Sequence, residues 1–203
     1  MFSLSKEEEV FLKKLNSPSK IQDYLDSLSF NFEKNGETNM SPRYVMEMKK
    51  AHCFEGALLA AAALMVAGEK PLILSLHVAD EDWPHAVTLY KKNGYWGAIS
   101  KTNHAVLRFR DPIYKTVREL AVSYFHEYFL AKNGEKTLRA YSRPINLKRF
   151  GTDWVTTSKS LSCITVAISK TKHQALIPRG NEIYVRVASP LERKASSIPE
   201  WKK

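Results

Sequence analysis

The sequence has few cysteines and no long apolar run, and each absence excludes a class of protein. Its 203 residues contain two cysteines, Cys53 and Cys163, which is too few for a disulfide framework or a cysteine-rich metal cluster. The longest apolar stretch, residues 57–67, is shorter than the ~20 residues that a membrane-spanning helix requires. The first residues lack the basic start and apolar run of a signal peptide. We therefore expect a cytoplasmic protein with no membrane contact.

The sequence also lacks internal repeats and low-complexity segments, and its composition is that of a globular protein. Hydrophobic residues make up 44% of the chain and aromatic residues 11%, which is enough for a core. We predict a single domain over residues 1–190, with a helical part (1–68) followed by a sheet and a long helix (69–190), and a basic tail over residues 191–203. The net charge of +10 permits anionic partners without identifying one.

Three helices are predicted near the N-terminus because each has a capping signal. Residues 5–8 (SKEE) have capping-box spacing, which predicts a helix to about residue 15. Ser-Pro pairs at 17–18 and 41–42 each place a cap residue before a proline at the first helical position, which predicts helices to about residues 28 and 49. Residues 31–40 are polar and include Asn35-Gly36, so we expect a loop there.

Residues 54–67 are almost free of polar side chains and predict a buried helix. This stretch contains no proline and no β-branched residue before Val66, whereas its alanines, leucines and methionine favour helices. Gly68 is placed to end the helix. Cys53 lies at its start, where the positive end of the helix dipole favours a thiolate.

A strand over residues 71–78 and a hairpin over residues 85–101 predict a sheet. Asn93-Gly94, between two alternating runs, is the strongest short signal for a hairpin. With this pair as the turn, the register places His85, Ser100 and Thr102 at the polar end of one face. Diagonal neighbours lie about 7–8 Å apart, so we expect Ser100, or a water beside it, to contact the His85 ring.

The second half of the chain has weaker patterns. Residues 105–110, 154–157, 161–169 and 182–188 predict strands. Asp111-Pro112 predicts a cap followed by a long helix to residue 132, which Asn133-Gly134 would end. The basic segment from Pro190 is expected to be frayed.

Two parts of the sequence resemble the transglutaminase-like superfamily in the order and spacing of their residues. Residues 41–45 (SPRYV) and 51–59 (AHCFEGALL), followed by Ala67-Gly68, resemble the nucleophile segment of that family. His85-Ala86-Val87 resembles its His-Ala strand, and residues 95–102 (YWGAISKT) resemble the strand that carries its aspartate. The resemblance implies an α+β, papain-like fold in which the cysteine-bearing helix is buried against an antiparallel sheet. It also implies Cys53 as the nucleophile and His85 as its base, and it puts Ser100 at the aspartate position.

Ser100 is a departure from the family pattern. A serine can hydrogen-bond an imidazole but cannot stabilise an imidazolium by charge. Cys53 and His85 therefore form a weaker dyad, or another acid takes the third role, or the site has lost its chemistry. Asp111 is the obvious substitute in the sequence, although an aspartate before Pro112 is typical of a helix cap.

Other candidate residues have structural explanations. Cys163 lies in an alternating stretch typical of a core strand, and His126 lies among four aromatic residues, which indicates packing. His52 precedes the nucleophile and either modulates its charge or lies in an exposed turn. Basic residues cluster at 108–118 and 139–149 without a nucleic-acid-binding motif, so we interpret them as a solvated or substrate-facing surface.

The sequence thus predicts thiol-dependent acyl transfer or hydrolysis at an amide, as in a peptidase, an amidase or a transglutaminase. Cys53 would attack, His85 would shuttle the proton, and the Cys53 backbone N–H would help hold the oxyanion. We expect a protein or peptide substrate, no metal or organic cofactor, and no nucleic-acid partner. The alternative is a binding or scaffold module that kept the fold, lost the chemistry and binds an acidic partner through its basic surface.

Overall fold

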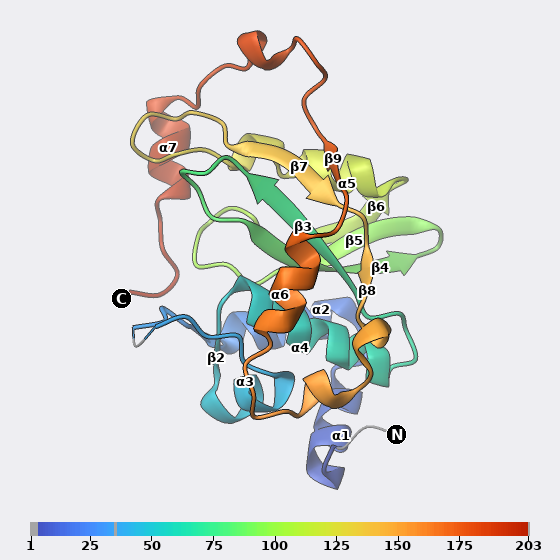
Figure 1. The fold of residues 1–203 in the computed structure, drawn as a ribbon. Helices are drawn as coiled ribbons and strands as arrows, with labels where there is room; N and C mark the ends of the chain where they lie inside the picture. The colour runs from blue at the N-terminus through green and yellow to red at the C-terminus, as the bar shows by residue number, and fades with distance from the viewer. Residues whose placement is uncertain (1–3, 35, 203) are drawn as a thin grey trace.

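The computed structural model describes residues 4–34 and 36–202, which form an α+β structure around a mostly antiparallel sheet (Figure 1). The strand order is β6-β5-β4-β3-β7-β9, and β8 also pairs with β3; all of these pairs are antiparallel. The strands are β3 (Leu72–Val78), β4 (His85–Lys92), β5 (Tyr95–Ile99), β6 (Arg110–Tyr114), β7 (Leu138–Ser142), β8 (Ile145–Asn146) and β9 (His173–Ala175). A separate parallel pair joins β1 (Ser29–Phe30) to β2 (Lys50–Ala51).

The predicted N-terminal helices are confirmed. They are α1 (Lys6–Lys14), α2 (Pro18–Ser27) and α3 (Pro42–Met48). The Ser5 and Ser17 side chains accept the capping bonds, and Ser5 with Glu8 completes the predicted capping box. Residues 31–34 and 36–40 form the expected loop, whereas Asn35 of the predicted Asn-Gly turn lies outside the described residues.

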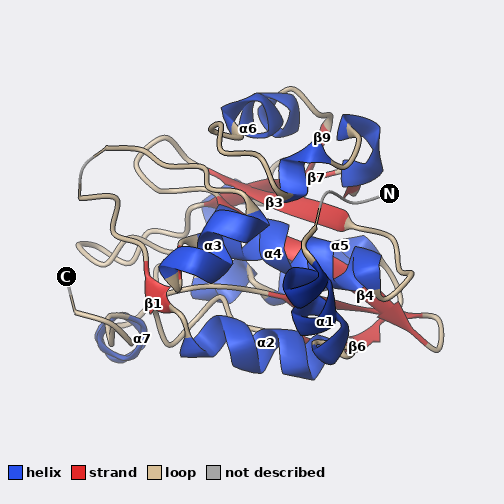
Figure 2. Ribbon diagram, turned by 90° about the horizontal axis from the view of Figure 1, so that it is seen from below, coloured by secondary structure: helices blue, strands red, loops and turns tan. Residues whose placement is uncertain are grey.

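The predicted central helix is α4 (Cys53–Val66), and residues 54–65 are buried on all sides. Helices α1, α2 and α3 pack around one side of it (Figure 2). Its other side packs on β4, where the Thr88 hydroxyl donates a 2.6 Å hydrogen bond to the Ala57 carbonyl. Gly68 follows with a φ of +86°, a left-handed conformation that glycine adopts without strain. The small side chains of the alanines in α4 let the neighbouring elements approach the helix closely.

The predicted hairpin and its register are also confirmed. Lys92 pairs with Tyr95, and Asn93 and Gly94 have φ values of +50° and +87°, as a type I′ turn requires. Successive residues of β4 point to opposite faces of the sheet, and each face has its own hydrophobic core. Ala86 packs on the α4 side, whereas Val87 and Leu89 pack on α5 (Val117–Ser123) on the opposite face.

The predicted strand over residues 105–110 and the long helix over residues 112–132 are wrong. Residues 105–109 lie outside any strand, and Asp111-Pro112 lies within β6 instead of starting a helix. The helix in this region is the short α5, followed by the 3-10 turn η1 (Phe125–Glu127). β6 is an edge strand, and an edge strand accepts proline because only one side of its backbone is paired.

The predicted C-terminal strands are wrong as well. The turn η3 (Asp153–Val155) overlaps residues 154–157, and the helix α6 (Ser162–Ser169) takes the place of the strand predicted at 161–169. The turn η4 (Glu182–Tyr184) begins the stretch 182–188. Another turn, η2 (Leu147–Phe150), precedes all three. In α6, Ile164 and Ile168 lie one turn apart and are buried in the same core cluster as α4 residues. Burying an isoleucine side chain stabilises by roughly 1.5–3 kcal/mol, which exceeds the helix-propensity cost of a β-branched residue, at most ~0.7 kcal/mol.

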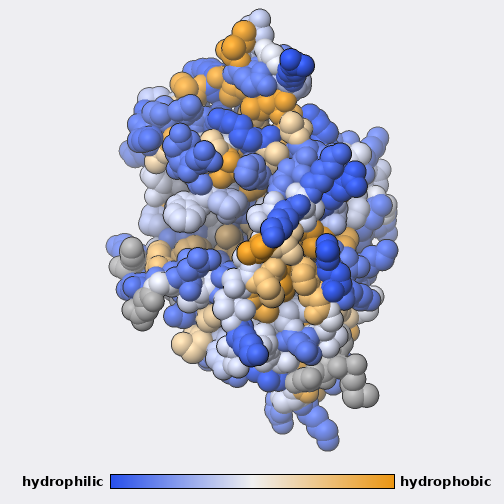
Figure 3. Space-filling model, in the orientation of Figure 1, coloured by the Kyte–Doolittle hydropathy of each residue, from blue (hydrophilic) through white to orange (hydrophobic). Residues whose placement is uncertain are grey.

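Two further expectations about the C-terminal part need correction. Cys163 is exposed, so it is not a core residue; hydrophobic surface gathers over α6, where Val166 is also exposed (Figure 3). The segment expected to be frayed contains α7 (Pro190–Ser196), which begins at a capping box of Ser189 and Glu192. No helix in the described ranges is long and apolar enough to cross a lipid bilayer.

Candidate active site

Cys53 is the first residue of α4, and its side chain is half-buried. The free N–H groups and positive dipole end of a helix favour an anion at this position. The contact between α4 and β4 brings the start of the helix to the start of the strand, where His85 lies. Cys53 and His85 are far apart in the sequence, and the packing of α4 on β4 brings them close together.

His85 and Ser100 are joined by a short buried hydrogen bond. His85 Nε2 lies 2.7 Å from Ser100 Oγ, and Ser100 Oγ lies 2.5 Å from the Leu107 carbonyl oxygen. A carbonyl only accepts, so the Ser100 hydroxyl donates its single hydrogen to Leu107. His85 Nε2 must then carry a hydrogen and donate it to Ser100. This chain of bonds fixes the tautomer of the neutral ring and leaves Nδ1 unprotonated.

The surroundings of Cys53 favour its thiolate. Burial raises the pKa of the thiol, but hydrogen bonds from His52 and His85, together with the charges of the two imidazoles, outweigh burial and hold that pKa well below its ordinary value. A thiolate is the nucleophilic form of cysteine. Cys53 therefore has the electrostatic setting of a reactive cysteine, and it interacts with two histidines instead of one.

A fully buried carboxylate, Glu55, lies on the His52 side of the site. It accepts hydrogen bonds from Asn31 Nδ2 (2.9 Å), Thr38 Oγ1 (2.8 Å) and the backbone N–H groups of Met40 (3.0 Å) and His52 (3.0 Å). A buried charge is tolerated when its lone pairs are satisfied in this way. Glu55 therefore fastens the 31–40 loop to the start of α4 and fixes the backbone just before Cys53.

The His52 ring is bound to the same network. Its Nε2 donates to the Thr38 carbonyl at 3.0 Å and lies 3.4 Å from a Glu55 carboxylate oxygen, while Nδ1 accepts the Phe54 N–H at 3.3 Å in the neutral ring. Burial lowers the pKa of His52, but the hydrogen bond and charge of Cys53, the Glu55 charge and the Thr38 carbonyl raise it to about 9. An imidazolium carries a hydrogen on both nitrogens, so the charged ring donates to the thiolate instead.

Helix α2 holds the backbone beside His85. The Gln22 side chain donates to the Ser100 carbonyl at 2.8 Å and accepts the Ser100 N–H at 3.0 Å, as a neighbouring strand would. Lys101 is fully buried and donates to the carbonyls of Leu25 (2.9 Å) and Leu28 (2.5 Å) at the C-terminal end of α2. The bonds of Gln22 and Lys101 therefore fix the backbone at Ser100 and at the residue that follows it.

Gly56 explains how Lys101 fits against α4. A β-carbon at Gly56 would lie 2.5 Å from the Lys101 β-carbon, closer than two carbon atoms can approach. The glycine three residues after Cys53 therefore allows the 100–101 backbone to lie directly on α4. This places Ser100 on the same end of the helix as the thiol.

Some of the contacts expected from the sequence are present in the structure, and others are not. The expected contact between His85 and Ser100 is present, whereas the Thr102 hydroxyl accepts the His104 N–H. Asp111 is exposed on β6, and in the described part of the chain no carboxylate bonds to His85. His52 is not an exposed turn residue. His126, expected to pack among aromatic residues, is exposed and has an edge-on ring contact with its neighbour Phe125.

Sequence reasoning missed Gln22, Asn31 and Thr38, because nothing in their local pattern reports a contact made far along the chain. The link between His52 and Glu55 did have a signal, since a cap residue followed three positions later by glutamate is capping-box spacing.

Within the described ranges, no group of three or more His, Cys, Asp or Glu side chains is placed to hold a metal ion. No protein-family model matches the chain, and no curated protein matches its sequence.

Proposed function

We propose that the protein catalyses thiol-dependent acyl transfer or hydrolysis at an amide, with Cys53 as the nucleophile and His85 as the proton carrier. The observation that carries this proposal is the bond chain from His85 Nε2 through Ser100 Oγ to the Leu107 carbonyl. It leaves His85 Nδ1 as the ring nitrogen that exchanges a proton with Cys53. The papain-like fold and the transglutaminase-like family implied by the sequence belong to the same proposal.

In the first half-reaction, the Cys53 thiolate attacks the amide carbonyl carbon and a C–S bond forms. The carbonyl oxygen becomes an oxyanion, for which the Cys53 backbone N–H is a donor that the helix leaves unused. The imidazolium of His85 gives its Nδ1 proton to the amide nitrogen, the C–N bond breaks, and an amine leaves. The acyl group remains on Cys53 as a thioester.

In the second half-reaction, neutral His85 takes a proton from water or from an amine as that molecule attacks the thioester. The C–S bond then breaks, the thiolate reforms, and the acid or the new amide leaves. Ser100 stays neutral throughout, since its hydroxyl orients the ring without adding charge. His52, with Glu55 beside it, stabilises the thiolate by its hydrogen bond and its charge.

A trapping experiment tests this proposal without knowledge of the natural substrate. The protein is incubated with a panel of peptide p-nitroanilides and short-chain thioesters, and its intact mass is followed. The expected result is one added acyl group that hydroxylamine removes, as expected for a thioester. Peptide mapping should find it on Cys53.

Two variants serve as the control pair. Cys53→Ala should take up no acyl group, whereas Cys163→Ala, which removes the exposed thiol of α6, should be acylated like the parent. Acylation lost with Cys163 but not with Cys53 would contradict the proposal. A parent that is never acylated would favour the scaffold alternative, which the neutral Ser100 in place of an aspartate also favours.

A further inference from the structure

Residues 199–201 dock beside the site through hydrogen bonds to residues 103 and 104. Pro199 forms an antiparallel bridge with His104, and the Glu200 N–H donates to the Asn103 carbonyl at 2.9 Å. The Asn103 side chain then takes both backbone groups of Trp201: its Oδ1 accepts the N–H at 2.7 Å, and its Nδ2 donates to the carbonyl at 3.0 Å. Backbone bonds of this kind are how a sheet edge takes an added strand.

Two side chains of this segment are also bound. Glu200 accepts a 3.0 Å bond from the Arg108 guanidinium. Trp201 forms part of the wall of a hollow of about 460 Å³, which residues 29–34 and Lys50 also line, and the Lys101 ammonium lies 5.9 Å from its ring centroid. The indole Nε1 is buried without a hydrogen-bond partner among the described residues, so this position accepts an aromatic ring without selecting tryptophan by a polar contact.

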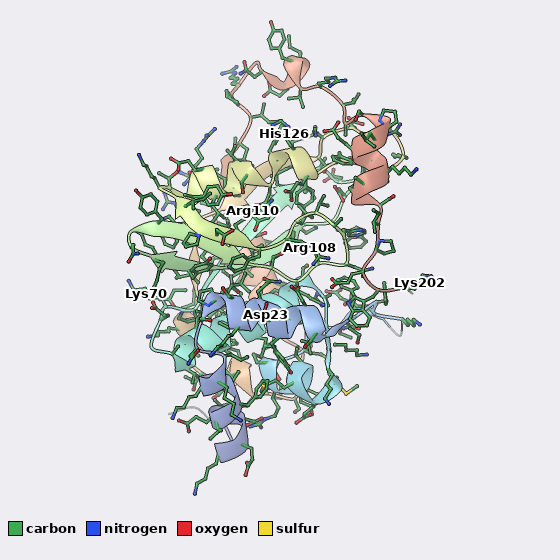
Figure 4. All side chains as sticks on the ribbon, turned by 180° about the vertical axis from the view of Figure 1, so that it is seen from behind. Asp23, Lys70, Arg108, Arg110, His126 and Lys202 are labelled. Carbon is green, nitrogen blue, oxygen red and sulfur yellow. The ribbon has the colours of Figure 1, made fainter. Side chains whose placement is uncertain are left out.

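The docked segment borders the site on two sides. Its partners Asn103 and His104 lie three and four positions after Ser100 in the chain. Thr38, which lines the same hollow as Trp201, is the residue whose carbonyl accepts from His52. In Figure 4 the segment descends from α7 past the loop that carries Arg108 and reaches Lys202. Figure 2 shows the same segment beside β1.

We propose that residues 101–104, Arg108 and the surface against which Trp201 packs form a recognition site for a peptide with an acidic residue followed by an aromatic one, and that residues 199–201 occupy this site as an internal competitor. A partner peptide of this chemistry must displace them. The consequence for Cys53, that displacement opens its approach, rests on the proposed function; the docking itself does not.

The first test measures peptide binding. A fluorescent peptide with the sequence of residues 197–203 (SIPEWKK) is titrated with the parent and with Trp201→Ala, which exposes the surface against which the indole packs. A tethered segment competes at an effective concentration in the millimolar range, so the variant should bind the peptide at least ~10-fold more tightly than the parent. Tyr184→Ala removes an aromatic residue that is 78% exposed on η4, and it should behave like the parent.

Altered peptides test the stated chemistry. Replacing the tryptophan of the peptide by alanine should weaken binding to the Trp201→Ala protein by ~10-fold or more, and replacing its glutamate by glutamine should weaken it several-fold. An additional Arg108→Ala change should abolish the preference for glutamate. Equal binding by parent and variant, or equal binding of the alanine peptide, would overturn the proposal.

The second test measures access to Cys53. Trp201→Ala should raise the alkylation rate with a bulky fluorescein maleimide several-fold more than the rate with iodoacetamide. An unchanged ratio of the two rates would refute the gating of Cys53 by this segment. If Cys53 reacts with neither reagent, the proposed function fails, while the peptide titration still decides whether the docking site exists.

Discussion

The two histidines beside Cys53 are held by opposite means. His85 donates to a hydroxyl that passes its hydrogen to a backbone carbonyl, so its partners are neutral. His52 lies 3.4 Å from the buried carboxylate of Glu55, which four donors satisfy. Among the described residues, the buried negative charge of the site therefore lies beside His52 and not beside His85.

The different partners of the two histidines indicate two different roles. A neutral partner fixes the orientation and tautomer of His85 and leaves it free to give up its proton. A carboxylate partner favours a lasting positive charge on His52, whose pKa is raised to about 9 because Cys53, Glu55 and Thr38 outweigh the effect of burial. We interpret His85 as the residue that moves a proton and His52 as a positioning residue that stabilises the thiolate.

Removing each histidine should give the largest contrast. His85→Ala should lower acyl transfer by ~10²–10⁴-fold, the usual contribution of a general acid or base. His52→Gln should reduce the thiolate fraction and lower the rate by about 10-fold, the equivalent of one pKa unit. The readout is the pH profile of turnover, since loss of His52 should move its acidic limb to higher pH. Equal losses in both variants would remove the distinction between their roles.

Glu55→Gln should be the most destabilising change on the His52 side. The new NH2 group would face either the donors of Asn31 and His52 on one side or those of Thr38 and Met40 on the other, leaving buried N–H or O–H groups unpaired. Breaking a buried, hydrogen-bonded charge in this way costs about 3 kcal/mol, measurable by urea unfolding. Glu9→Gln breaks the exposed pair with Lys13 and should cost no more than ~0.5 kcal/mol. Similar small losses for both variants would show that the Glu55 network holds little of the structure.

Gln22→Ala should have a smaller effect on both stability and reaction rate. It leaves the buried N–H and carbonyl of Ser100 without their α2 partner, at a cost of about 1–2 kcal/mol. Because Ser100 orients His85, turnover should also fall several-fold while Cys53 remains alkylatable. Lys20→Ala on the exposed side of α2 is the control. An unchanged rate with lowered stability would mean that α2 supports the fold without positioning Ser100.

Ser100→Asp should change the rate least and in the opposite direction. A carboxylate would stabilise the His85 imidazolium, so the thiolate fraction at neutral pH should rise by a few-fold at most. The Leu107 carbonyl, 2.5 Å from Ser100 Oγ, would then face a second acceptor, and we expect a stability loss of about 1–2 kcal/mol. An aspartate variant that folds normally and reacts no faster would mean that residue 100 does not orient His85.

The first half of the chain could be predicted because its signals are local. Ser5, Ser17 and Asn93-Gly94 act on backbone groups within a few residues, so their meaning does not depend on the rest of the fold. The sequence pattern also put His85 and Ser100 on one face, because the turn sets the register. Asp111-Pro112 shows the limit, since it has the same Ser/Asp-Pro form as a helix start but pairs as an edge strand with β5.

The elements and contacts that the sequence did not predict depend on tertiary packing. The β-branched residues of α6 favour a strand, and only the burial of Ile164 and Ile168 against α4 decides for a helix. Gln22 reaches Ser100 across 78 positions, a contact that no local spacing encodes. Two overlooked signals were local, namely the capping boxes at Ser189 and at His52. The second of these would have pointed to Glu55.

The most direct test of the central claim is the rate of Cys53 alkylation by iodoacetamide between pH 5 and 9. The claim is that His85, His52 and the α4 terminus together stabilise the Cys53 thiolate, whose pKa they lower against the effect of burial. Peptide mapping follows Cys53 and the exposed Cys163 in the same sample, so Cys163 reports any effect of pH on the reagent. We predict that Cys53 stays reactive well below pH ~8.5, the pKa of a free cysteine, and that His85→Ala moves this limit upward. A Cys53 that becomes reactive only near pH 8.5, or that is unaffected by loss of His85, would contradict the claim.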